Sequence, residues 1–100
     1  MTKLVIAERA HETLTELEKD PAQKARYRKV ARTLGILQVN RQHPGLQAHK
    51  LKSITHSMPD GSAVDIWEAY VENNTPGAWR IFYHLGTKDT VTVIAIRQHL

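Results

Sequence analysis

The chain has 100 residues, enough for one domain with a modest core, and 41% of them are apolar, as in a folded globular protein. The 14 Lys and Arg outnumber the 10 Asp and Glu, and the resulting net charge of +4 suits an acidic or polyanionic partner. The absence of cysteine excludes disulfides, thiolate metal sites and cysteine nucleophiles.

The first residues predict a short strand followed by a helix. The strand, Leu4 to Ala7, is an apolar run far too short for a signal peptide or a membrane span, so we expect a cytoplasmic protein. Ala10, Leu14 and Leu17 then follow at helical spacing, and this helix should end at Lys19-Asp20-Pro21.

A second helix is predicted from Pro21 to about Gln38, because Asp20 is a good N-cap and proline a good first helical residue. Its apolar stripe consists of Ala25, Val30, Ala31, Leu34 and Leu37. Its basic residues lie mostly elsewhere and are Lys24, Arg26, Arg28, Lys29 and Arg32. Such a run can contact phosphates, but a solvated helix face is its commoner meaning.

Loops and a short strand connect this helix hairpin to the last third of the chain. Residues 40–45 and 58–62 predict loops, with a short strand at 46–53 between them. The order β, α, α and then a β-rich segment predicts one α+β domain over residues 1–100, with the helices on one face of the sheet.

The last third predicts three antiparallel strands with short loops between them. They are Val64–Val71, Trp79–Leu85 and Thr90–Arg97. Pairing of Leu85 with Thr90 would sort the last two strands into two faces, because side chains alternate. One face then holds Arg80, Phe82, His84, Val91, Val93, Ala95, Arg97 and His99. The other holds Trp79, Ile81, Tyr83, Leu85, Ile94 and Ile96, and its apolar centre predicts burial.

Pairing of Glu72 with Ala78 across a five-residue loop would extend both faces to the first of these strands. Trp67, Ala69 and Val71 then join the buried face, and Glu68 and Tyr70 join the arginine face. A loop shorter by one residue would reverse this assignment. The apolar match of Trp67 to the core favours the five-residue loop.

Structural roles compete with functional ones for several of these residues. Glu68 faces Arg80 in this arrangement, and an ion pair between them would be a common feature of an exposed sheet face. Arg97 has no carboxylate at the matched positions, which favours a functional role. Trp67 and Trp79 fall on the core face and predict packing. The six histidines lack the spacing of a metal site.

Five segments in order resemble the RelE/ParE superfamily of bacterial toxins from toxin–antitoxin pairs, and the likeness covers nearly the whole chain. They are His43-Pro44-Gly45-Leu46, Lys50-Leu51-Lys52, Trp67-Glu68-Ala69-Tyr70, Trp79-Arg80-Ile81-Phe82-Tyr83 and Val93-Ile94-Ala95-Ile96-Arg97-Gln98-His99. The resemblance implies a small twisted antiparallel sheet of three to four strands, with an N-terminal helix hairpin on one face and a basic concave face opposite. In RelE-like members this open face docks in the ribosomal A site and cleaves mRNA by attack of a 2′-hydroxyl on the adjacent phosphodiester.

The resemblance also implies a catalytic set. Arg80 matches an arginine that contacts the scissile phosphate, and Arg97 matches one near the end of the last strand. His99 matches the C-terminal histidine of YoeB-like and HigB-like members, a candidate general acid. His49 lies near where some members carry a glutamate base, and histidine can do that work at neutral pH.

The residues expected to bind RNA are Lys50, Lys52, Tyr70 and His84. The phenol of Tyr70 is suited to base stacking or proton transfer. The chain also departs from the family. RelE has paired lysines on the second strand where this chain has residues 67–70, and Leu100 stands where many members have a catalytic tyrosine.

The expected partners are a cognate antitoxin, the ribosome and mRNA, with no membrane, no metal and no small-molecule cofactor. Two alternatives stay open because of the departures. One is a ParE-like inhibitor that binds DNA gyrase without cutting RNA. The other is a catalytically degraded member that only binds antitoxin or nucleic acid.

Overall fold

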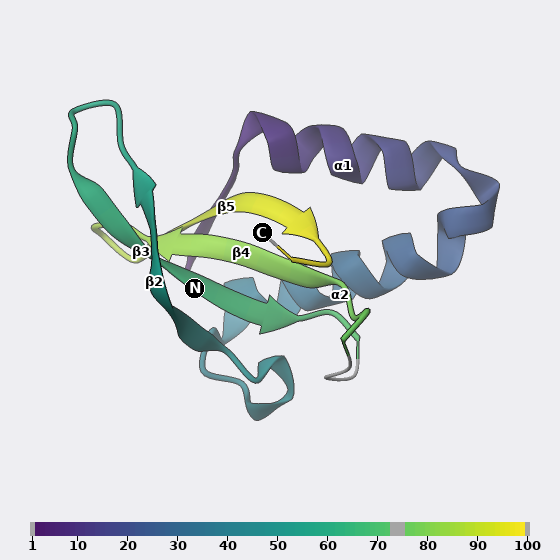
Figure 1. Ribbon diagram of the computed structural model, residues 1–100. Helices are drawn as coiled ribbons and strands as arrows, with labels where there is room; N and C mark the ends of the chain where they lie inside the picture. The colour runs from purple at the N-terminus through teal and green to yellow at the C-terminus, as the bar shows by residue number, and fades with distance from the viewer. Residues whose placement is uncertain (1, 73–75, 100) are drawn as a thin grey trace.

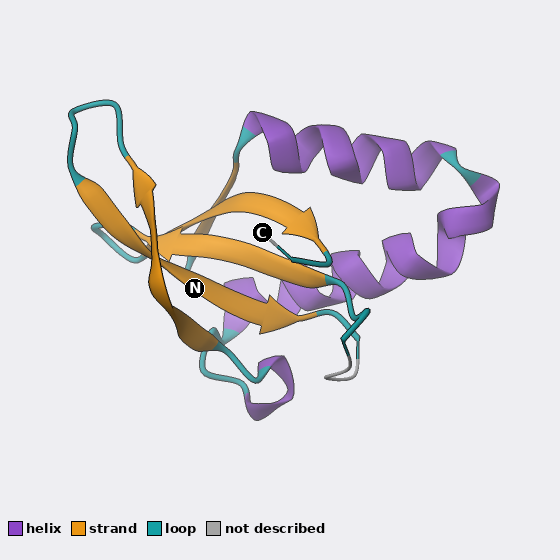
Figure 2. Cartoon of the chain, in the orientation of Figure 1, coloured by secondary structure: helices purple, strands orange, loops and turns teal. Residues whose placement is uncertain are grey.

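The computed structural model describes residues 2–72 and 76–99, and its helices and strands follow the predicted order (Figures 1 and 2). The helical elements are α1 (Glu8–Lys19), the short turn η1 (Pro21–Gln23), α2 (Lys24–Val39) and the short turn η2 (Pro44–Leu46). The strands are β1 (Lys3–Ile6), β2 (His49–Ser57), β3 (Ala63–Tyr70), β4 (Arg80–Leu85) and β5 (Thr90–Arg97). Within the described ranges, no helix is long and apolar enough to cross a membrane.

The helix hairpin forms as predicted, with one difference at its bend. The side chain of Asp20 accepts a hydrogen bond from the backbone N–H of Ala22 at 2.9 Å, which caps the turn η1 rather than α2 itself. The helix α2 begins after this turn, at Lys24. The proline therefore starts helical backbone where expected, but its first turn has 3₁₀ geometry.

The apolar stripe predicted for α2 is only partly right. Val30, Leu34 and Leu37 are buried as expected, whereas Ala25 and Ala31 are exposed. Small alanine side chains add little to burial, so the long aliphatic side chains determine which side of the helix faces the sheet.

The strands form one five-stranded sheet in the order β1-β5-β4-β3-β2. The strand β1 runs parallel to β5, and the remaining neighbours are antiparallel. The sheet is therefore mixed, and the predicted antiparallel sheet of three to four strands was wrong in strand count and in one direction. The parallel pair joins the two ends of the chain, and nothing in a four-residue strand indicates such a distant partner.

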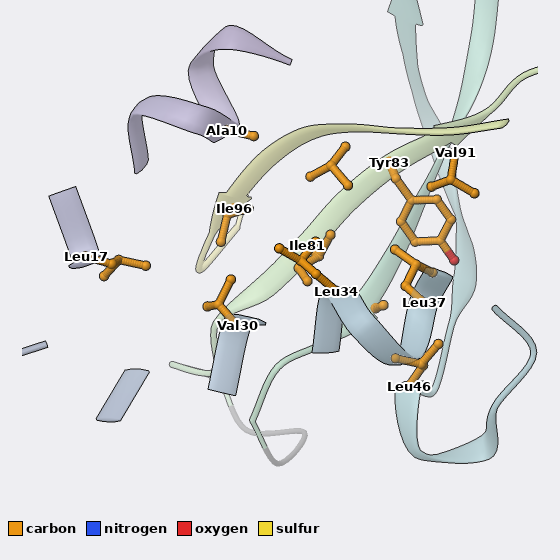
Figure 3. Packing of buried hydrophobic residues seen from close by; sticks show 12 residues of the cluster. Ala10, Leu17, Val30, Leu34, Leu37, Leu46, Ile81, Tyr83, Val91 and Ile96 are labelled. Atoms are coloured by element: carbon orange, nitrogen blue, oxygen red, sulfur yellow. The ribbon is translucent and has the colours of Figure 1, made fainter. Parts of the chain in front are cut away.

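The main core lies between the helices and one face of the sheet. Figure 3 shows side chains from α1 and α2 meeting those from β4 and β5. The buried members of this core are Ala10, Leu17, Val30, Leu34, Leu37, Leu46, Ala69, Ile81, Tyr83, Val91, Val93 and Ile96. Trp67 and Trp79 pack against it, which confirms that they contribute to packing.

The predicted register between β3 and β4 is confirmed. Tyr70 pairs with Arg80 and Trp67 pairs with Tyr83, the register that pairing of Glu72 with Ala78 implies. Residues 73–75 of the connecting loop lie outside the described residues. Glu68 and Tyr70 therefore share a face with Arg80, on the side of the sheet away from the helices.

The predicted register between β4 and β5 is partly wrong because β5 contains a bulge. Leu85 pairs with Val91 rather than with Thr90, and the pairing shifts between Tyr83–Val93 and Phe82–Ala95. One extra residue in a strand reverses the side-chain alternation beyond it. As a result Val91 and Val93 join the main core, while Ile94 lies on the open face and Arg97 remains on it.

A second, smaller apolar cluster covers part of the open face. Ile66, Phe82 and Ala95 are buried there, and Leu51 and Ile94 pack against them. The segment of β2 that supplies Leu51 lies at a break in the pairing between Lys50 and Thr55, next to Ser53 at φ 66°. This irregularity bends β2 over one end of the face, as Figure 1 shows, and leaves the other end open.

Replacement of Leu37 by alanine should lower the free energy of unfolding by about 2–5 kcal/mol, because this side chain is 0% exposed and its loss leaves a cavity. Val39→Ala on the same helix is the matched control, since Val39 is 69% exposed and its loss should cost less than about 0.5 kcal/mol. Urea unfolding of both variants checks this, and equal losses would contradict the packing described.

Candidate functional site

The candidate site lies where β3 and β5 end and β4 begins (Figure 1). In the strand registers His49 pairs with Glu68, Tyr70 with Arg80, and Arg80 with Arg97. Residues directly opposite on adjacent strands share a face, with Cβ atoms about 4.5–5.5 Å apart. The sheet therefore brings together His49, Tyr70, Arg80 and Arg97, four of the eight residues expected in the site.

A buried carboxylate holds the centre of this site. Glu68 is 4% exposed, and its Oε2 atom lies 3.3 Å from Nη1 of Arg80, which confirms the anticipated ion pair. Its other oxygen, Oε1, lies 3.1 Å from Nε2 of His49. A buried carboxylate requires such partners because desolvation of an unpaired charge is costly. The contact with His49 could not be read from the sequence, which gave no register between β2 and β3.

Tyr70 completes the cluster from above Arg80. The guanidinium of Arg80 lies 5.2 Å from the centre of the Tyr70 ring, in a cation–π contact. The centre of the Tyr70 ring lies 6.0 Å from the centre of the His49 ring. Burial and the neighbouring Glu68 raise the pKa of Tyr70, with Arg80 acting in the opposite direction. The phenol therefore stays neutral at physiological pH and presents a face suited to stacking.

Arg97 and His99 are exposed at the end of β5. Neither forms an ion pair within residues 2–72 and 76–99. The intervening Gln98 donates from Nε2 to the carbonyl of Gly77 at 3.1 Å, which attaches this end of the chain to the loop before β4. Leu100, where many RelE-like toxins have a tyrosine, lies outside the described residues.

The two lysines differ in position. Lys50 pairs with Trp67, so it lies on the helix side of the sheet, and its Nζ is 3.8 Å from Oδ2 of Asp65. Lys52 is exposed in the irregular part of β2. The structure thus separates Lys50 from the Arg80 face, because a strand directs successive side chains to opposite sides.

His84 is buried rather than displayed. It is 7% exposed, its ring stacks on that of His56 at 5.8 Å, and its buried Nδ1 has no hydrogen-bond partner among the described residues. It lies beside the small apolar cluster that the bent β2 covers. The expectation that His84 is displayed for contact with RNA was therefore wrong. Burial, and to a lesser degree His56, lower the pKa of His84.

The basic run of α2 has a largely structural role at two positions. Arg26 and Lys29 each lie 3.8 Å from Oε2 of Glu72, and Oε1 of Glu72 accepts a hydrogen bond from the backbone N–H of Trp79 at 3.0 Å. These contacts attach α2 to the loop between β3 and β4. Beside them a hollow of about 550 Å³ opens next to Tyr70, with Arg32 and His43 on its wall.

The site residues offer no ready metal centre. Across residues 2–72 and 76–99, His, Asp and Glu side chains do not gather in groups of three or more that could hold a metal ion.

Comparison with known proteins finds a likeness in structure but none in sequence. No family model and no curated protein sequence matches the chain. The fold is similar to that of the YoeB dimer from Staphylococcus aureus. The two chains superpose with a TM-score of 0.67 over 99% of this chain and 98% of the YoeB chain, at 14% sequence identity. At this identity the likeness to YoeB establishes a shared α+β fold over the whole domain.

The buried His84 should make the protein less stable in acid. Because its pKa is lowered from 6.5 in the folded state, the unfolded chain binds this proton more tightly. The free energy of unfolding that depends on a neutral His84 is fully present above pH 6.5. It is lost as the pH falls below that value, by at most about 1.4 kcal/mol per pH unit. Urea unfolding between pH 7.5 and 5.5 should show a smaller loss for His84→Leu than for wild type. The exposed His11→Gln is the control, and an unchanged slope in His84→Leu would assign the loss to another group.

Proposed function

We propose that this protein is the toxin of a toxin–antitoxin pair and cleaves mRNA in the ribosomal A site, by attack of a 2′-hydroxyl on the adjacent phosphodiester. The observation that carries the proposal is the pairing of Arg80 with Arg97 beside His49 and Tyr70, on the face away from the helices. The YoeB-like fold and the ordered resemblance to RelE/ParE toxins support the same class.

The two arginines suit the charge that develops during cleavage. Attack by a 2′-oxygen adds negative charge to the phosphate, and guanidinium groups placed beforehand stabilise that charge. Arg80 is oriented by Glu68 and Tyr70, and its contact with Glu68 uses only part of a guanidinium that has five N–H donors. Arg97, exposed on the next strand, supplies the second positive charge.

The remaining residues bind the nucleotides and exchange protons. The neutral ring of Tyr70 stacks on a base, and Lys52 contacts the RNA backbone. His49 and His99 exchange the two protons of the reaction, since histidine both takes and gives a proton near neutral pH. Lys50 and His84 are left out of this surface because one lies on the other face and the other is buried.

The proposed partners follow from this chemistry. The ribosome and mRNA supply the substrate, and an antitoxin covers the basic face until the toxin is released. The nucleophile belongs to the RNA, so the reaction requires no cofactor. The proposal places the protein in the cytoplasm, where translation occurs.

Controlled induction in a bacterial host tests the proposal. Wild type should stop translation rapidly and create new mRNA 5′ ends within codons, measured by radiolabelled amino-acid incorporation and primer extension. Arg97→Ala should reduce cleavage by about 10²–10³-fold, the usual cost of removing one donor to a developing oxyanion. Arg28→Ala is the matched control, because this arginine is exposed on α2, away from the proposed site.

The ion pair between Glu68 and Arg80 favours the second candidate, an inhibitor of DNA gyrase, because it partly neutralises the RNA-cleaving face. Growth arrest with translation initially intact, together with inhibited supercoiling by purified gyrase, would replace the nuclease proposal with this one. If neither translation nor supercoiling were inhibited, the protein would be a degraded member that only binds its partners.

A further inference from the structure

The ring of His49 has an oxygen atom at each of its nitrogens. Nε2 lies 3.1 Å from Oε1 of Glu68, and Nδ1 lies 3.0 Å from the backbone carbonyl of Gln47. A carboxylate and a carbonyl accept hydrogen bonds and do not donate them. In either neutral form of the ring, one nitrogen would direct its lone pair at an oxygen. Only the doubly protonated ring presents an N–H group to both oxygens.

The surroundings of the ring support this doubly protonated form. Nη1 of Arg80, which can only donate hydrogen bonds, lies 3.3 Å from the second oxygen of Glu68 and places a positive charge beside the carboxylate. The nearby Tyr70 is a neutral phenol. The neighbouring Lys50 is directed to the opposite face, where it pairs with Asp65 at 3.8 Å. The charges around the ring are thus one carboxylate in direct contact and one guanidinium beyond it.

We propose, building on the proposed function, that His49 donates a proton to the leaving group of the cleaved RNA and that Glu68 is the positioning residue which fixes this role. This reverses the role of base that the family resemblance implied for His49. The bond between the 2′-oxygen and phosphorus forms, and the bond between phosphorus and the 5′-oxygen breaks. The 2′-hydroxyl proton passes to His99, the proton from His49 passes to the 5′-oxygen, and the products are a 2′,3′-cyclic phosphate and a 5′-hydroxyl.

Nδ1 is the nitrogen placed to make this transfer. Its partner is the backbone of Gln47, an exposed residue with a left-handed backbone at φ 48°, and the His49 side chain is itself 48% exposed. A substrate oxygen can take the place of this carbonyl without disturbing the sheet. Nε2 stays on Glu68, which keeps the ring oriented and its positive charge balanced, as a carboxylate does behind a catalytic histidine.

Nitrogen NMR on the isolated protein tests the arrangement without any RNA. In ¹⁵N-labelled wild type at pH 7.5, both ring nitrogens of His49 should give the signals of a protonated imidazolium. In Glu68→Gln the ring should become a neutral form with one protonated nitrogen, and His49→Gln identifies the signals. A neutral His49 in the wild-type protein at this pH would overturn the inference.

An RNA with sulfur in place of the 5′-oxygen at the cleavage position tests the catalytic step. A thiolate leaves without protonation, so this RNA does not need a proton donor. On ribosomes programmed with normal mRNA, His49→Gln should be about 10²–10⁴-fold slower than wild type, the usual contribution of a general acid. With the sulfur-containing mRNA it should approach the wild-type rate, whereas His99→Gln should stay slow on both.

The possible outcomes separate the inference from the function on which it rests. An equal loss on both RNAs for His49→Gln would show that His49 is not the donor, although the protein is a nuclease. Failure of wild type to cleave either RNA would overturn the proposed function and the catalytic role together. The NMR result would then still decide whether Glu68 holds a protonated ring.

Discussion

The packing of α1 and α2 against one face of the sheet is the constraint on which the rest of the structure depends. Leu34 and Leu37 of α2 lie against Ile81 and Tyr83 of β4 in the main core. Once alternate residues of β4 are buried there, the intervening ones must lie on the other face. Arg80 is thereby directed away from the helices, and the neighbouring strands align their polar residues with it. The site is thus a consequence of how the core is packed.

Glu68 connects the packing of the site with the proposed chemistry. A carboxylate that is 4% exposed needs partners, and the two it has, Arg80 and His49, are residues on which the proposed reaction depends. The structural and functional interpretations of the Arg80 ion pair are therefore compatible. In the proposed reaction, the carboxylate would orient the guanidinium and the imidazole before substrate arrives, so that less reorganisation is needed when negative charge develops on the phosphate.

Much of the fold follows from local patterns, and the errors have a common cause. Helical spacing located α1, and strand composition with the apolar match of Trp67 gave the correct register of β3 on β4. The bulge at Ile94 was missed because one extra residue leaves no mark in an apolar strand, yet it moved Val91 and Val93 into the core. The bend of β2, whose His56 covers His84, was missed because it depends on a break in the pairing with β3.

The sequence by itself determined the α+β class and the helix hairpin, because these depend on periodicity within single segments. Only the tertiary structure decided that β1 pairs with β5, that His84 is buried and that His49 contacts Glu68. Each of these depends on contacts between strands whose pairing is fixed by bulges and by packing across the whole domain. The free energy of such contacts is shared among distant residues, so no local stretch of sequence encodes them.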